Sequence, residues 1–169
     1  LLWNNGSGVI RGNVKFAGTT NVVDSGSGLE NDGNWHHVAL TWMSGSKTSA
    51  NNITRIYIDG SQTDSDAIGN TWNGTAGELV IGRNGIQSNA YFNGHINDVA
   101  IFDDALTSSE VSAIYNSGSP KDESSHSGLV AYYTMEAYSD SDTTLADDSS
   151  NSNTLTITNS TNIDSTDTP

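Results

Sequence analysis

Short stretches of alternating apolar and polar residues recur along the chain, and Gly, Asn, Asp and Ser separate them. In the clearest stretch, residues 35–42, the side chains of Val38, Leu40 and Trp42 fall on one face, because successive side chains of a strand point to opposite sides. Similar stretches predict strands at residues 12–18, 54–60, 78–82, 92–102, 128–135 and 154–158. Many short strands separated by turn residues are typical of an all-β sandwich or barrel.

Local signals predict one hairpin turn and one helix. The Asp-Gly pair at residues 59–60 is a strong signal for a tight turn between two antiparallel strands. Thr107 and Glu110 have the spacing of a helical capping box, which predicts a short amphipathic helix at residues 108–116. Gly118 stands where the C-terminal cap of that helix belongs.

The composition excludes several classes of function. Twenty acidic and 6 basic residues give a net charge of −14, which repels phosphate backbones and argues against nucleic-acid binding. The chain has no cysteine, so it forms neither disulfides nor cysteine-based zinc sites. No apolar run approaches the ~20 residues of a membrane-spanning helix, and we expect no membrane insertion.

Five segments together carry a resemblance to a known family. They occupy residues 33–42, 56–60, 79–82, 92–102 and 105–111, and include Gly-Asn-Trp-His-His-Val-Ala-Leu-Thr-Trp and Ile-Tyr-Ile-Asp-Gly. In this order and spacing they resemble the laminin-G-like jelly roll of the concanavalin A-like lectin and glucanase superfamily. The resemblance implies a two-sheet antiparallel jelly-roll sandwich with one short helix.

The same resemblance divides the chain into three parts. Residues 1–118 resemble a laminin-G-like domain truncated at its N-terminus, and residues 119–127 form a polar linker. Residues 128–169 begin with a segment that opens the domain in the family, yet here it follows the other strands. They either begin a following repeat or supply a strand that completes the sandwich. In the second case residues 128–138 pair beside residues 95–103 and cover an exposed sheet edge.

The acidic residues do not form a catalytic pattern. A glycosidase needs two carboxyl groups ~5–10 Å apart across a sugar. The five glutamates are scattered among turns, strand edges and the expected helix, and no Gly-x-Ser-x-Gly nucleophile motif precedes a helix. We therefore expect no enzyme activity. His36 and His37 are adjacent on a strand and face opposite sides, so we interpret them as sheet positions that fix the preceding loop.

Calcium is the cofactor that the resemblance implies. In relatives, a turn similar to residues 148–153 and an acidic residue matching Asp98 hold a structural calcium ion. The candidate ligands here are Asp98, Asp148, Asn151 and Asn153, whose oxygen atoms are of the kind that calcium prefers. The alternative is a solvated, Asx-rich turn that holds no metal.

Aromatic side chains in loops are candidates for glycan binding, because a pyranose ring stacks on an exposed aromatic face. Trp72 and its neighbour Asn73 lie in a Gly- and Asn-rich loop, and Tyr57 and Tyr91 are further candidates. Trp72 packed onto the sandwich is the alternative. Trp35 and Trp42 are expected in the core.

These patterns predict a non-catalytic module at an extracellular, cell-surface or virion surface, which serves adhesion or structural display and binds glycans. The chain resembles laminin-G-like repeats of bacterial adhesins and of structural proteins of marine phages. The expected partners are surface glycans or neighbouring subunits and repeats, including further copies of the chain. The alternatives are a purely architectural repeat in a fibre or shell, and an accessory carbohydrate-binding domain of a secreted glycoside hydrolase.

Overall fold

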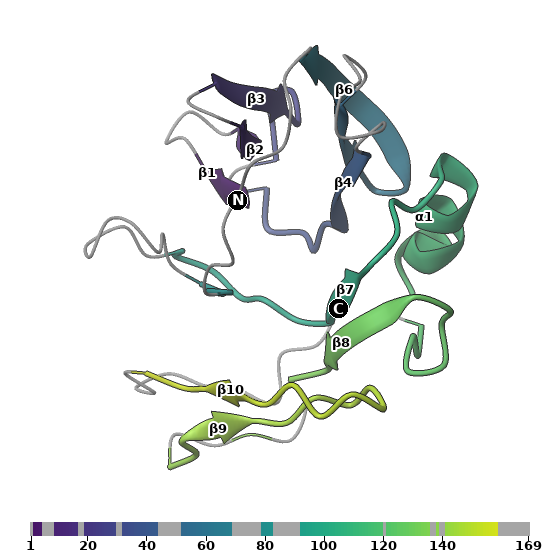
Figure 1. Ribbon diagram of the computed structural model, residues 1–169. Helices are drawn as coiled ribbons and strands as arrows, with labels where there is room; N and C mark the ends of the chain where they lie inside the picture. Colours follow the sequence, from purple (N-terminus) through teal and green to yellow (C-terminus); the bar gives the residue numbers. More distant parts are fainter. Residues whose placement is uncertain are drawn as a thin grey trace. The chain divides into compact units, whose positions relative to one another are not determined.

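The computed structural model describes most of the chain and divides it into two compact units. The first unit comprises Leu1–Asn93 and Ala105–Gly118, and the second comprises Gly94–Asp104 and Ser119–Pro169 (Figure 1). The described residues are 2–4, 9–16, 19–29, 32–43, 52–68, 79–82, 92–119, 121–135, 138 and 141–158. Each unit is described by itself below.

The first unit contains two antiparallel sheets. The strands of one are β1 (Leu2–Asn4), β2 (Ile10–Phe16) and β3 (Thr19–Asp24), and those of the other are β4 (Val38–Met43), β5 (Asn52–Ile58) and β6 (Ser61–Ile68). The sheet orders are β1-β2-β3 and β4-β5-β6, so every strand pairs with its neighbour in sequence. The expected turn at residues 59–60 joins β5 to β6. The all-β prediction is confirmed.

Both sheets contribute to one apolar core. Val23 of β3 and Ile56 of β5 are fully buried, and Ile58 packs with them. The alternation of β5 places Ile56 and Ile58 on the same face, together with buried Thr54. Thr54 Oγ1 accepts a hydrogen bond of 3.2 Å from the side-chain NH₂ group of buried Asn21, which gives both buried groups a partner. Each buried aliphatic side chain contributes about 1.5–3 kcal/mol to stability.

The helix α1 (Ser108–Tyr115) begins at the expected capping box. Glu110 Oε2 accepts a 2.7 Å hydrogen bond from the backbone N–H of Thr107, and the Glu110 N–H donates to Thr107 Oγ1 at 3.3 Å. The expected C-terminal cap at Gly118 is wrong. Asn116 takes the left-handed conformation there, with φ of 44°, and a short 3₁₀ turn, Asn116–Gly118, follows.

The second unit contains two short antiparallel pairs. In one, β7 (Val99–Phe102) pairs with β8 (Leu129–Tyr133), and in the other β9 (Thr144–Leu145) pairs with β10 (Leu155–Thr156) (Figure 1). The expected pairing of residues 128–138 beside residues 95–103 is therefore confirmed for residues 129–133 and 99–102. It also explains why residues 94–104 group with residues 119–169 rather than with the expected first domain.

Several expected strands are shorter or absent. Residues 79–82 of the expected strand at 78–82 form no strand, and the expected strand at 92–102 is extended only at β7. Asp98 has a φ of 51°, a conformation that interrupts an extended strand just before β7. Strand β6 is absent from the sequence prediction. Its sequence, Ser-Gln-Thr-Asp-Ser-Asp-Ala-Ile, lacks an apolar alternation.

Candidate functional site

Of the four residues predicted to bind glycans, the structure describes only Tyr57. Trp72, Asn73 and Tyr91 lie outside the described residues. Tyr57 is only 1% exposed, so neither face of its ring is available to a sugar and this prediction is wrong. Its hydroxyl lies 3.3 Å from Ser108 Oγ, because Tyr57 points away from the apolar face of β5 and toward helix α1.

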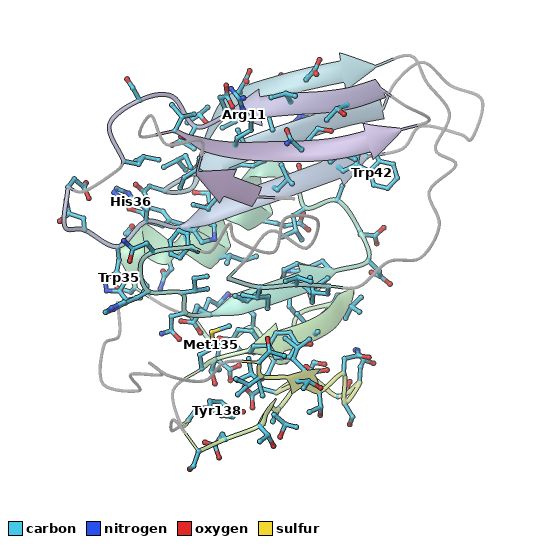
Figure 2. The ribbon with its side chains drawn as sticks, turned by 90° about the vertical axis from the view of Figure 1, so that its left-hand side faces the viewer. Arg11, Trp35, His36, Trp42, Met135 and Tyr138 are labelled. Carbon is cyan, nitrogen blue, oxygen red and sulfur yellow. The ribbon has the colours of Figure 1, made fainter. Side chains whose placement is uncertain are left out.

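Trp35 lies on the segment that leads into β4, next to His36 (Figure 2). Its side chain is 37% exposed, so the expectation that Trp35 belongs to the core is wrong. Trp42 is half-buried near the end of β4. In β4, Val38 and Leu40 are partly buried against the core as the alternation predicts, whereas the buried residue of the strand is Thr41, on the opposite face.

His36 joins two loops of the first unit. Its Nδ1 lies 2.9 Å from Asp59 Oδ2 and its Nε2 lies 3.0 Å from Asp32 Oδ2. The backbone N–H of His37 donates to the other oxygen of Asp59 at 3.0 Å. Asp32 also accepts hydrogen bonds of 2.9 Å from the backbone and the side-chain amide of Asn34. His36 therefore fixes the loop before the strand, as interpreted, but both histidines precede β4 and are not sheet positions.

Asp98, the first candidate calcium ligand, contacts Tyr132 in the second unit. The hydroxyl of Tyr132 donates to Asp98 Oδ1 at 2.8 Å, and Lys121 contributes a backbone carbonyl 3.4 Å from the same hydroxyl. Burial and the nearby Asp98 carboxylate both raise the pKa of Tyr132, so the phenol keeps its proton. Asp98 therefore accepts a hydrogen bond from the core side of β8.

The other three candidate ligands lie in the turn between β9 and β10, and this turn is held against β8. The side-chain amides of Asn151 and Asn153 both donate to the carbonyl of Val130, at 3.0 and 2.8 Å. Asp148 Oδ2 accepts from the backbone N–H and the hydroxyl of Thr134, at 3.2 and 2.9 Å. The structure thus brings these three residues together along one strand.

Asp147 is the central carboxylate of this turn, and the sequence analysis did not single it out. Its Oδ1 accepts from the backbone N–H groups of Tyr132 and Ser149, both at 2.9 Å, and its Oδ2 accepts from that of Asn153 at 2.7 Å. Desolvation raises the pKa of Asp147, but these hydrogen bonds outweigh it and lower the pKa to about 2. The Asp-x-Ser spacing of an Asx turn is the signal that could have identified it.

The donor set does not fit a calcium ion. The Asp147 carboxylate is taken by three backbone N–H groups, and the amides of Asn151 and Asn153 present nitrogen to β8. Within the described ranges, no three His, Asp or Glu side chains are grouped so that they could hold a metal ion. Backbone N–H groups of the turn and of β8 thus occupy the Asp147 carboxylate, which a cation would otherwise bind.

Four carboxyl groups of the described residues have a pKa below the ordinary range. They are Asp24, Asp32, Asp122 and Asp147. For Asp24 the main cause is Arg11, whose guanidinium makes two hydrogen bonds to it, at 2.7 and 2.8 Å.

The described part of the chain contains no helix with the length and apolarity needed to cross a membrane.

The fold and these contacts define a β-sandwich module whose polar residues in the described loops serve mainly to hold the loops. Residues 1–112 match the family described as the concanavalin A-like lectin/glucanases superfamily. The chain therefore belongs to this family, in its laminin-G-like branch, as the sequence resemblance implied.

Relatives place this module within much longer proteins. The chain is 33% identical over 96 residues to sushi, von Willebrand factor type A, EGF and pentraxin domain-containing protein 1 of Rattus norvegicus, and equally to that of Mus musculus. The match covers 52% of this chain and 2% of each relative, so the chain spans a small part of their length. A solved S-layer domain-containing protein from Clostridium thermocellum is 28% identical, with a TM-score of 0.42, over 64% of this chain and 52% of that one.

Proposed function

We propose that this chain is a non-catalytic module of an extracellular, cell or virion surface, which serves adhesion or structural display and binds glycans. The observation that carries the proposal is membership of the concanavalin A-like lectin/glucanases superfamily over residues 1–112. The match to a small part of large proteins named for several domain types supports a role as one module among others.

Trp72, with Asn73 and Tyr91, is the proposed glycan-binding surface. The ring of Trp72 would stack on a pyranose face, and the amide of Asn73 would hydrogen-bond to sugar hydroxyls. Tyr57 is not part of this proposal, because it is buried.

A glycan array tests the proposal directly. We expect the purified protein to bind a defined set of glycans, and the variants Trp72→Ala and Tyr91→Ala to lose that binding. Phe92→Ala is the matched control, because Phe92 is an exposed aromatic residue next to Tyr91. An array that stays blank with and without calcium, using folded protein, would contradict glycan binding.

The β7–β8 pair favours a second candidate, a purely architectural repeat. A segment that resembles the opening of a domain here pairs with a strand that precedes it in the chain. The same pairing between neighbouring repeats or copies would join them into a fibre or shell. Sedimentation over a range of protein concentrations tests this candidate, which expects self-association. A monomer at all concentrations, combined with glycan binding, would eliminate it.

A further inference from the structure

The cluster formed by His36, Asp32 and Asp59, named here the His36 latch, holds three segments together. Asp32 belongs to the loop before β4, His36 to the entry into β4, and Asp59 to the turn between β5 and β6. The ring of His36 lies between the two carboxylates, with distances of 2.9 and 3.0 Å to one oxygen of each.

This geometry requires a particular protonation state. An ionised carboxylate only accepts hydrogen bonds, whereas a neutral imidazole has one N–H donor and one bare nitrogen. Both ring nitrogens of His36 face carboxylate oxygens at hydrogen-bond distance, so both contacts are attractive only when both nitrogens carry protons. The neutral ring can keep one contact, and in the other its lone pair faces the carboxylate.

The turn that the latch holds is itself fixed by its surroundings. Asp59 and Gly60 both have positive φ angles, of 49° and 75°, as a tight hairpin turn requires. Gly60 lies against the ring of Tyr115 in α1, and the same ring lies 5.9 Å from that of His37. The latch therefore connects the loop at residues 32–36 to a turn that is packed against the helix.

We propose that the His36 latch is a pH-dependent lock: the imidazolium ties the loop to the β5–β6 turn, and loss of its proton releases one tie. Below the pKa of the free side chain, both ties are present. As the pH rises through the pKa of the folded ring, one hydrogen bond to Asp32 or Asp59 is lost and the loop loosens.

The electrostatics agree with this direction. Burial lowers the pKa of His36, but the hydrogen bonds with Asp59 and then Asp32 outweigh it, and the net pKa is raised above 6.5. The pKa of Asp32 is lowered to about 2, first by the side chain and backbone N–H of Asn34 and then by His36. Asp32 thus stays ionised throughout the range in which His36 titrates.

The charged and titratable groups next to His36 are few among the described residues. Asp32 comes from the loop and Asp59 from the turn, and these are the groups that shift its pKa. His37, on the neighbouring position, has a pKa lowered mainly by burial, so its contribution to stability has the opposite dependence on pH. Tyr115 of α1 contacts His37 and the turn.

Titration of the imidazole signals by NMR tests the proposal. Its first measurement uses the wild-type protein, so it does not require that a variant folds. In the wild-type protein we expect the midpoint of His36 above the 6.5 of an ordinary histidine, and a loss of order at the Asn34 and His37 amides over the same pH range. The variant Asp32→Asn should move the His36 midpoint downward. Asp104→Asn is the matched control, because it removes the same charge from an exposed position outside the latch.

A second measurement uses stability. The interaction of His36 with Asp32, from a double-mutant cycle of His36→Gln and Asp32→Asn, should change the unfolding equilibrium constant on the order of two- to fivefold at pH 5.5 and should be smaller at pH 9, where His36 has lost its charge. A His36 midpoint at or below 6.5, or one that Asp32→Asn and Asp104→Asn shift equally, would overturn the proposal. A pH-independent interaction in the cycle would also overturn it.

Discussion

Asp147 and Tyr132 are joined by a 2.9 Å hydrogen bond from the backbone N–H of Tyr132 to Asp147 Oδ1. This bond holds the turn between β9 and β10 against the middle of β8, and two more backbone N–H groups complete the surroundings of the carboxylate. Charge-assisted hydrogen bonds of this kind are stronger than neutral ones. One side chain thus organises a turn whose sequence is almost entirely polar.

Asp147→Asn is expected to destabilise the second unit. The amide keeps one accepting oxygen and places an NH₂ group opposite backbone N–H donors, which costs about 1–3 kcal/mol. Because the pKa of Asp147 is about 2 in the folded protein and 3.8 for an ordinary aspartate, its contribution to stability is present above pH 3.8 and is lost as the pH falls through 2. Urea unfolding at pH 7 and pH 2.5 measures both effects. Asp104→Asn is the control, and equal effects of the two variants would contradict this role of Asp147.

Calcium is expected to leave the stability of the protein unchanged. The Asp147 carboxylate already accepts three N–H groups and Asp148 Oδ2 accepts two hydrogen bonds from Thr134, so a cation would have to displace donors that hold the turn. Thermal unfolding in the presence of millimolar calcium and of EDTA should give the same Tm. A Tm that rises with calcium, and that Asp147→Asn or Asp148→Asn abolishes, would show that the turn binds the ion after all.

The sequence predicted those features that depend on short-range signals. The Asp-Gly turn at residues 59–60 and the capping box of Thr107 and Glu110 are both present, because each is a contact between residues close in the chain. The pairing of β7 with β8 was also predictable, since the order of strands in the family places these segments side by side.

Features that depend on distant partners could not be predicted. Strand β6 is polar, and it is held by pairing with β5 and by its carboxylates, which accept backbone N–H groups of β3: Asp64 from Asp24 at 3.0 Å and Asp66 from Val22 at 3.2 Å. The alternation of β5 predicts that Tyr57 lies at the surface. Helix α1, some fifty residues later in the chain, covers it instead. The burial of a strand face is decided by what packs on it, and alternation alone does not reveal this.

Ile56→Ala is expected to destabilise the first unit strongly. Ile56 is fully buried in the core between the two sheets, and truncation of such a side chain to alanine costs about 2–5 kcal/mol. Val22→Ala is the control, because Val22 is 39% exposed on the neighbouring sheet. Urea denaturation of the two variants measures the difference. If Ile56→Ala lowered the free energy of unfolding no more than Val22→Ala, Ile56 would lie outside the core.

Gly60→Ala is expected to destabilise the β5–β6 hairpin for two separable reasons. The φ of 75° strains any residue with a Cβ atom, and the added methyl group would lie 2.8 Å from Cδ1 of Tyr115. The combined cost is about 1–3 kcal/mol. In a Tyr115→Ala background the clash disappears and only the backbone strain remains, so Gly60→Ala should cost less there. An equal cost in both backgrounds would mean that Tyr115 does not pack on the turn.

A disulfide between β7 and β8 tests the strand pairing on which the description of the second unit depends. Ile101 and Ala131 are partners in this antiparallel pair, and partner Cα atoms in such pairs lie about 4.5–5.5 Å apart, within the range for a disulfide. The natural chain has no cysteine, so the variant Ile101→Cys/Ala131→Cys contains only the two new thiols. We expect it to form an intramolecular bond in mild oxidant, seen as faster migration on a non-reducing gel. Ile101→Cys/Thr156→Cys, whose positions are not strand partners, should stay reduced under the same conditions. A bond that forms only between molecules would show instead that β8 pairs with β7 of a neighbouring copy, as the architectural alternative requires.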